Sequence, residues 1–86
     1  MEIELSEDAR QEFLSLDSEL KRRFKAHMEK LIRMPPRRHL KFGVPYHVED
    51  VTQQARLVYK CDGKVLYVVR CFARHKDYEK WYASYK

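Results

Sequence analysis

Apolar residues at the start of the chain first alternate with acids and then give way to a helix signal. Ile3 and Leu5 alternate with glutamates, which predicts a short, half-buried strand. Ser6 follows as a helix N-cap, because Glu7 and Asp8 after it complement the positive end of a helix. We therefore expect a strand that leads directly into a first helix.

A second, longer helix is expected after Asp17 or Ser18, either of which can cap it. Its apolar positions recur at spacings of three and four along one inner face: Leu20, Phe24, Met28 and Leu31. The prolines of "PPRR" end this helix, since proline lacks the amide hydrogen and clashes with the preceding turn.

Three strands are expected in the second half of the chain, at about 44–51, 54–60 and 64–72. The last two flank "CDG", a strong hairpin signal. A two-residue loop formed by "DG" would mix apolar and charged side chains on each face of the sheet.

A three-residue loop, with Gly63 left-handed and Lys60 opposite Lys64, separates the two kinds of side chain and is therefore favoured. One face then carries Ala55, Leu57, Tyr59, Val65, Tyr67, Val69 and Cys71. The other carries Gln54, Arg56, Val58, Lys60, Lys64, Leu66, Val68, Arg70 and Phe72. We expect the apolar face to pack on the helices, with Arg56 and Arg70 together on the opposite face.

"HKDYEKWYASYK" is expected to close the chain as a short helix. The helical spacing of Trp81 and Tyr82 is typical of packing residues. His75 and Tyr78 lie at the junction between the last strand and this helix, so their side chains can reach back over the basic face. The predicted fold class is α+β, with a short N-terminal strand, two packed helices on one face of an antiparallel sheet and a short C-terminal helix.

Length and charge narrow the choice of partner. At 86 residues the chain has room for a single domain, 1–86. Residues 1–19 sum to −6, residues 20–41 to +8 and residues 52–86 to +5. A basic middle and end favour a polyanionic partner such as nucleic acid, although a solvated lysine-rich helix face would also explain the middle.

Membrane association is not expected. The longest apolar run, "VLYVV", is too short to cross a bilayer, and the acidic start of the chain lacks the order of a signal peptide. The two cysteines fall far apart in the predicted hairpin, as in a protein of a reducing compartment. We therefore expect a cytoplasmic protein.

The sequence lacks the motifs that several kinds of chemistry require. There is no CxxC, no HxxxH on a helix and no acidic cluster beside a histidine pair, so neither a metal site nor a cofactor is expected. Two glycines cannot build a phosphate-binding loop. No serine or cysteine stands in a context that would activate it as a nucleophile.

Arginines, histidines and tyrosines remain, and this set suits RNA cleavage by the substrate's own 2′-hydroxyl. Histidine can act as acid or base near neutral pH, and arginine presents a planar fork of donors to phosphate oxygens. Aromatic rings can stack on an unpaired base. The same composition also occurs in RNA-binding domains that cut nothing.

The run "LKFGVPYHVEDVTQQARLVYKCDGKVLYVVRCFARHKDYEKW", about half of the chain, resembles the RelE/YoeB/YafQ toxins of bacterial and archaeal toxin–antitoxin systems. The order of the predicted elements is similar to that family too. The resemblance implies a ribosome-dependent mRNA endonuclease that enters the decoding site, needs no metal and is neutralised by a cognate antitoxin.

The resemblance also implies roles for particular residues. Arg56 occupies the place of the arginine in the "RLVY" strand that acts on the scissile phosphate. His75 and Tyr78 stand where several members have a catalytic acid or base. Arg70 and Arg74 compete for the place of a basic residue at the end of the last strand.

This sequence departs from the family on the strand before "RLVY". RelE relies there on paired lysines and YoeB on a glutamate, whereas this chain has "PYHVEDV". His47 or Glu49 would have to serve, and His47 is the better candidate. The lysines expected to contact RNA are Lys41, Lys60, Lys64 and Lys76.

A related class offers a different function. ParE-like toxins share the fold but bind DNA gyrase without cutting RNA, and they generally lack a catalytic histidine near the terminus. His75 therefore favours the nuclease. A third possibility is an inactive module whose basic face only grips phosphates.

Overall fold

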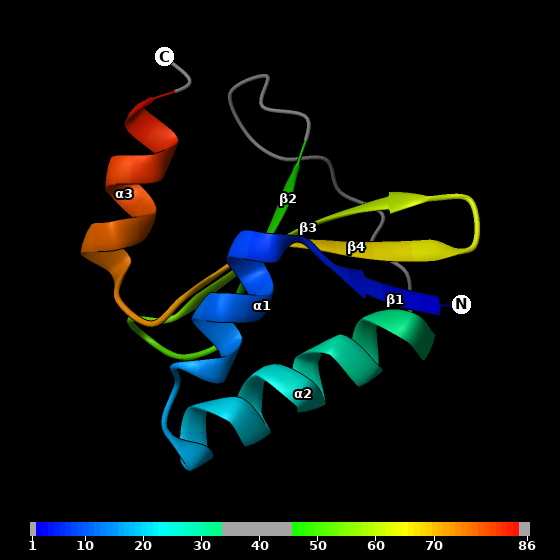
Figure 1. Cartoon of the computed structure of the whole chain (residues 1–86), viewed down its shortest axis with the longest axis horizontal. Coiled ribbons are helices and arrows are strands. Elements are labelled where there is room, and N and C mark those ends of the chain that lie inside the picture. The colour runs from blue at the N-terminus through cyan, green and yellow to red at the C-terminus, as the bar shows by residue number, and fades with distance from the viewer. Residues whose placement is uncertain (1, 34–45, 85–86) are drawn as a thin grey trace.

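A computed structural model describes residues 2–33 and 46–84. The elements are β1 (Glu2–Leu5), α1 (Glu7–Leu14), α2 (Ser18–Arg33), β2 (His47–Asp50), β3 (Arg56–Asp62), β4 (Val65–Phe72) and α3 (His75–Ala83). The strands form one sheet in the order β1-β4-β3-β2. Helices α1 and α2 cover one face, and α3 stands at the end of the sheet away from the β3–β4 turn (Figure 1). The expected α+β arrangement is confirmed.

Both predicted helix starts carry a side-chain cap. The Ser6 hydroxyl accepts a hydrogen bond from the Ala9 amide at 3.0 Å and so caps α1. The Asp17 carboxylate accepts one from the Leu20 amide at 2.8 Å, which makes Asp17, of the two candidates, the residue that caps α2. Helix α2 ends at Arg33, just before the proline pair.

The sheet differs from the antiparallel one expected, because β1 runs parallel to β4. Glu2 lies beside Val65 and Leu5 beside Val68, whereas the other two pairings are antiparallel. Parallel neighbours need a long crossover connection. The chain from α1 to β3 supplies it, so the sheet is mixed.

The favoured three-residue hairpin loop is wrong. Asp62 lies opposite Val65, and the turn is the pair Gly63-Lys64. Gly63 has the expected positive φ of 61°, which suits the first position of a two-residue hairpin turn whose twist matches the strands. Lys64 therefore lies in the turn and not opposite Lys60.

The ladder between β3 and β4 contains a β-bulge. Val58 lies opposite Arg70, whereas Tyr59 lies opposite Val68, so Val69 has no residue opposite it on β3. Because of this extra residue, the side chains that face the helices have even numbers in one half of β4 and odd numbers in the other. Toward the turn the even-numbered residues of β4 face the helices, and toward α3 the odd-numbered Cys71 does.

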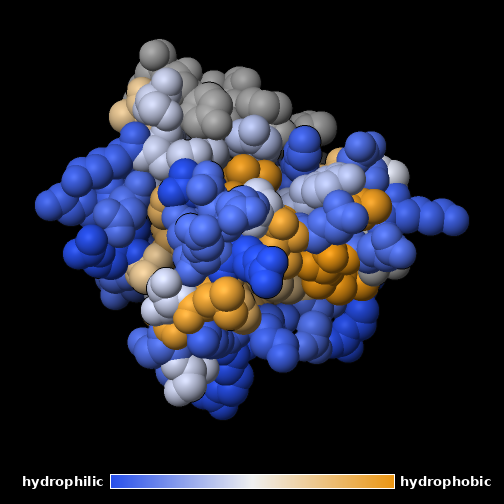
Figure 2. All heavy atoms as spheres, viewed as in Figure 1, coloured by the Kyte–Doolittle hydropathy of each residue, from blue (hydrophilic) through white to orange (hydrophobic). Residues whose placement is uncertain are grey.

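The main core lies between the sheet and helices α1 and α2. It contains Ala9, Leu16, Phe24, Met28, Leu31, Val51, Ala55, Leu57, Tyr59, Leu66, Val68 and Cys71. The expectation that Val65, Tyr67 and Val69 join this core is wrong, because of the bulge and the shifted turn. On the face seen in Figure 2, hydrophilic residues predominate and hydrophobic residues show as smaller patches among them.

The bulge leaves the two strand arginines on one face, as expected. Arg56 lies opposite Phe72, and Arg70 lies opposite Val58. Val58 and Phe72 are also buried, but outside the main core. The end of the sheet near α3 is therefore covered on its second face as well.

Candidate functional site

Arg56 begins β3 and is fixed by the loop that joins β2 to β3. Its Nη1 donates to the carbonyls of Thr52, Gln53 and Ala55 at 2.9, 3.1 and 3.0 Å. Its Nε lies 3.1 Å from an oxygen of Asp50, and 13% of the side chain is exposed. Among the described residues, Nη2 is left without a hydrogen-bond partner and so can donate to a substrate.

Thr52 shapes this loop. Its hydroxyl accepts hydrogen bonds from the amides of Gln54 and Ala55, at 3.2 and 2.9 Å. The Val51 amide donates to the Ala55 carbonyl at 3.0 Å, which closes the turn. Threonine at the start of a turn commonly makes such local bonds. The carbonyls that hold Arg56 are thus set by the sequence "VTQQA".

Tyr78 of α3 lies within electrostatic range of Arg56. Burial is the largest effect on its hydroxyl and raises the pKa of Tyr78, and neighbouring Tyr82 adds to the rise. The charge of Arg56 lowers this pKa and that of Asp50 raises it, with a rise as the net result. The Tyr78 hydroxyl therefore stays protonated at neutral pH and can serve as a proton donor.

An aromatic cluster seats α3 on the sheet. The Tyr78 ring lies 6.1 Å from that of Phe72 and 6.0 Å from that of Tyr82, both nearly edge-on. Trp81 lies 5.8 Å from Phe72 and 5.8 Å from Tyr46. The packing role expected of Trp81 and Tyr82 is confirmed, and Tyr78 is held by the same cluster.

His75 is the first residue of α3 and lies beside Tyr78. Its Nδ1 is 2.7 Å from a Glu79 oxygen one turn later, and 40% of the side chain is exposed. The His75 and Tyr78 ring centres are 5.7 Å apart. A carboxylate on Nδ1 orients the ring so that Nε2 can exchange a proton with a substrate.

Arg70 is paired with a residue that sequence reasoning missed. Its Nε lies 3.0 and 3.1 Å from the two oxygens of Glu12 on α1, and its Nη2 is 2.6 Å from one of them. The same carboxylate accepts the Cys71 amide at 3.0 Å, at the edge of β4 beyond the end of β1. Its position three residues after buried Ala9 puts Glu12 on the sheet side of α1, which is the signal that could have found it.

A cleft of about 700 Å³ opens between α1, the end of β4 and α3. Its lining includes Arg70, Phe72, Lys80 and Trp81. The Arg70 guanidinium also lies over the Phe72 ring at 4.7 Å, so its outer face is partly covered. Arg56 and Tyr78 are not among the residues that line this cleft.

His47 is not brought to Arg56. It lies opposite Tyr59, a core residue on the helix-covered face, and the two rings stack at 5.3 Å. Side chains alternate along a strand, so Val48 and Asp50 are the residues of β2 that share the face of Arg56, and Asp50 is the charged one.

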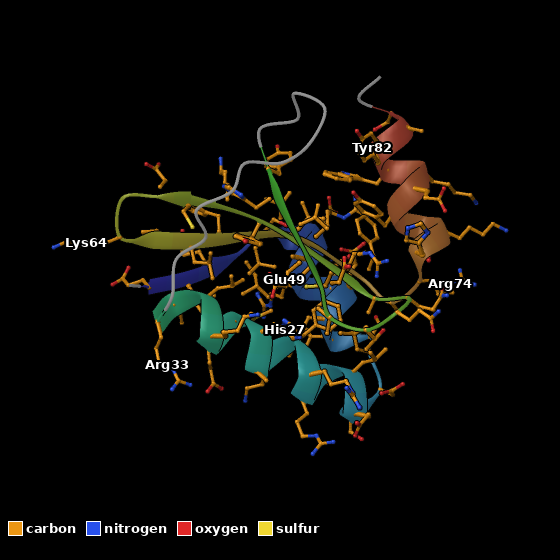
Figure 3. The ribbon with its side chains drawn as sticks, turned by 180° about the vertical axis from the view of Figure 1, so that it is seen from behind. His27, Arg33, Glu49, Lys64, Arg74 and Tyr82 are labelled. Atoms are coloured by element: carbon orange, nitrogen blue, oxygen red, sulfur yellow. The ribbon has the colours of Figure 1, made fainter. Side chains whose placement is uncertain are left out.

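Glu49 likewise faces α2, where it forms an ion cluster with His27 and Lys30 (Figure 3). One carboxylate oxygen is 3.1 Å from His27 Nδ1 and 2.6 Å from Lys30 Nζ. Burial opposes ionisation, but these two hydrogen bonds outweigh it and lower the pKa of Glu49. Neither candidate that we expected to replace the family's lysines or glutamate lies on the arginine face.

Arg74 and Lys76 lie at the start of α3. Arg74 is its N-cap residue, and its Nε is 3.1 Å from an oxygen of Asp77. Both basic side chains are exposed. They lie at the same end of the sheet as His75, so this end combines exposed positive charge with the proton donors.

The hairpin lysines are separated from this end. Lys64 lies at the tip of the hairpin, far from Arg74 (Figure 3). Lys60 lies over the Tyr67 ring, with Nζ 5.5 Å from its centre. Lys41 lies outside the described residues. Of the lysines expected to contact RNA, Lys76 alone is near the arginine face in the described part of the chain.

Two general properties of residues 2–33 and 46–84 bear on the class of site. No group of three or more histidine, cysteine or acidic side chains gathers there as metal ligands. In the same residues no helix is long and apolar enough to cross a membrane.

The fold is that of a known class of toxins. The YoeB/ParE toxin from Agrobacterium tumefaciens matches with a TM-score of 0.71 at 18% identity, over 83% of this chain and 95% of that one. The YoeB dimer from Staphylococcus aureus matches with a TM-score of 0.73 at 17% identity, over 83% and 93%. YoeB in the YoeB-YefM complex from S. aureus gives 0.72 at 16%, over 83% and 93%.

At these identities the likeness establishes the fold, and the similarity to RelE/YoeB toxins expected from the sequence is confirmed at that level. The sequence itself matches no family model and no curated protein.

Proposed function

We propose that this protein is the toxin of a toxin–antitoxin system and acts as a ribosome-dependent mRNA endonuclease. The observation that carries the proposal is the environment of Arg56, whose guanidinium is held by three carbonyls and Asp50 beside the protonated hydroxyl of Tyr78. A fixed cation next to a proton donor is what phosphodiester cleavage requires. The YoeB-like fold supports the same function.

In the proposed reaction the 2′-oxygen of the substrate attacks the neighbouring phosphorus. A base removes the proton of the 2′-hydroxyl, a 2′,3′-cyclic phosphate forms, and the bond from phosphorus to the 5′-oxygen breaks. Arg56 binds the non-bridging oxygens, where negative charge grows in the transition state. Because the nucleophile belongs to the substrate, the protein supplies only acid, base and charge.

Tyr78 and His75 are the candidate acids for the leaving 5′-oxygen. The raised pKa of Tyr78 keeps its proton available, and His75, half-exposed beside it, can deliver or replace that proton. Arg70, Arg74 and Lys76 surround this end of the sheet and would bind backbone phosphates on either side of the cut.

The hairpin lysines would contact RNA further from the cut. Lys60 lies four positions after Arg56 along β3, a span of about 13 Å at ~3.3 Å per residue. In a decoding site these lysines would contact messenger RNA or ribosomal RNA. The protein would act in the cytoplasm.

A cognate antitoxin is the proposed protein partner. One support is that a fold neighbour from S. aureus is a heterotetrameric complex of YoeB-YefM toxin-antitoxin. A gyrase-directed toxin is the second candidate function, favoured by the name of the Agrobacterium neighbour as a YoeB/ParE toxin.

Induced expression separates the two functions. Wild type and an Arg56→Ala, His75→Ala double variant would be induced and a cellular message mapped by primer extension. Cuts in phase with codons that vanish in the double variant, but persist in Arg22→Ala on the exposed side of α2, are expected for the nuclease. Growth arrest with intact mRNA and double-strand DNA breaks would overturn it in favour of gyrase.

A further inference from the structure

The end of β2 places a carboxylate beside Arg56. Asp50 and Arg56 are direct partners in the β2–β3 ladder, so their side chains lie on the same face of the sheet. His47 and Glu49 alternate with Asp50 and face the helices instead.

Asp50 combines a fixed position with access. One of its oxygens lies 3.1 Å from Arg56 Nε, yet 75% of its side chain is exposed. Two other carboxylates near this end of the sheet lack that access: Glu49 is held by His27 and Lys30, and Glu12 by Arg70 and the Cys71 amide.

The chemistry of the cut requires a base in this place. The 2′-hydroxyl and the scissile phosphate sit on adjacent carbons of one ribose. A base that removes the hydroxyl proton must therefore lie next to the group that binds the phosphate. Arg56 Nε lies 3.1 Å from Asp50, and Nη2 has no hydrogen-bond partner among the described residues, so one guanidinium can bind a phosphate oxygen while it stays beside Asp50.

We infer that Asp50 is the general base of the reaction, an inference that rests on the proposed function. Asp50 takes the proton from the 2′-hydroxyl as that oxygen bonds to phosphorus. The electrons of the broken bond leave on the 5′-oxygen, which takes a proton from Tyr78 or His75. Asp50 ends the step protonated, the donor ends it deprotonated, and one proton crosses the site.

Base and acid then differ by environment, as a paired mechanism requires. Asp50 is exposed beside a permanent positive charge, whereas the Tyr78 hydroxyl is half-buried among rings and keeps its proton. Asp50 itself contributes to holding that proton on Tyr78, because its negative charge disfavours a second anion.

Asp50→Asn tests the inference, because asparagine keeps an oxygen for Arg56 Nε and loses only the basic carboxylate. Single-turnover cleavage of ribosome-bound mRNA would be measured between about pH 6.5 and 8.5. We expect a loss of about 10²- to 10³-fold. We also expect the remaining rate to rise about tenfold per pH unit, more steeply than wild type, because hydroxide must then supply the alkoxide.

A substrate with sulfur in place of the 5′-oxygen at the cut separates base from acid. Sulfur leaves without a proton, so it should restore Tyr78→Phe and His75→Ala but not Asp50→Asn. The matched control is Asp62→Asn, which removes a carboxylate at the far end of the hairpin and should cut like wild type.

Asp50→Glu guards against a variant that fails to fold, since it keeps the charge and should retain partial activity with the pH slope of wild type. The inference is overturned if Asp50→Asn cuts within threefold of wild type, or if its loss leaves the pH slope unchanged, because Asp50 then only positions Arg56. If wild type itself does not cut ribosome-bound mRNA, the proposed function fails and Asp50 has no base role.

Discussion

The two faces of the sheet differ in how far their paired carboxylates are exposed to solvent. On the helix-covered face, Glu49 meets both His27 and Lys30 and is largely withdrawn from solvent. On the other face, Asp50 meets Arg56 but remains mostly open to solvent. Both carboxylates come from the same short strand, one residue apart.

The difference teaches where to look for function in so small a domain. A charge that is enclosed by its partners contributes to the fold, whereas a charge that is anchored on one side and open on the other can meet a ligand. Asp50, with three-quarters of its side chain exposed beside Arg56, is of the second kind.

The largest effect is expected from the buried face. Leu66→Ala removes a fully buried side chain and leaves a cavity, which should cost about 3–5 kcal/mol in the free energy of unfolding. Val65→Ala, on the neighbouring residue of β4, should cost less than about 1 kcal/mol. Urea denaturation measures both. An equal cost at the two positions would mean that the register and bulge are wrong.

Arg56→Lys should affect activity more than stability. Lysine keeps the charge but cannot span the loop carbonyls, Asp50 and a phosphate with one planar group. We expect ribosome-dependent cleavage to fall about 10²-fold, equivalent to about 2.7 kcal/mol. Arg22→Lys on α2 is the control, and comparable rates for the two variants would remove Arg56 from the site.

Tyr78→Phe should have a moderate effect, because His75 can supply the proton in its place. The cleavage rate should fall about tenfold, and the double variant with His75→Ala should lose about 10²-fold or more. Thermal unfolding should change little, since the ring contacts remain. Tyr67→Phe near the hairpin is the control, and a full rate in the double variant would exclude both residues as acids.

The smallest effect is expected from the enclosed ion cluster. The lowered pKa of Glu49 means that the folded protein binds this proton less tightly than the unfolded chain. Its stabilisation is therefore full above the ordinary value of 4.5 and is lost as pH falls through the folded value. Glu49→Gln should cost about 1 kcal/mol near neutral pH.

The same substitution should cost less at a pH well below 4.5, because protonation of the Glu49 carboxyl removes the charge that the substitution also removes. Chemical denaturation of the variant and wild type at both pH values measures the change. A cost that does not depend on pH would show that the cluster acts by packing and not by charge.

Local chemistry made part of this fold predictable from sequence. Ser6 and Asp17 cap their helices through their own side chains, and Phe24, Met28 and Leu31 follow the helical period into the core. The shared face of Arg56 and Arg70 was also predicted, although from a wrong loop length. The prediction was nevertheless correct. The shifted turn and the bulge each exchange the two faces of β4, so the two changes cancel at the end of the ladder near α3.

Long-range choices were not predictable in the same way. The bulge at Val69 adds one residue that alternation cannot reveal. Glu12 meets Arg70 only because α1 lies along the edge of β4. Asp50 was overlooked beside His47 and Glu49 because the face of an edge strand depends on its register with β3, which the sequence of β2 does not contain.

The parallel pairing of β1 with β4 bears on how the protein is made. The Ser6 hydroxyl bonds the Val69 carbonyl across 63 residues, and Glu12 meets Arg70 across 58. Such contacts close late, because the intervening chain must be ordered first. While β4 is still inside the ribosome that synthesises it, β1 has no strand to join. A nascent chain therefore reaches its native form only after β4 has emerged, and until then the ribosome carries an unfolded product.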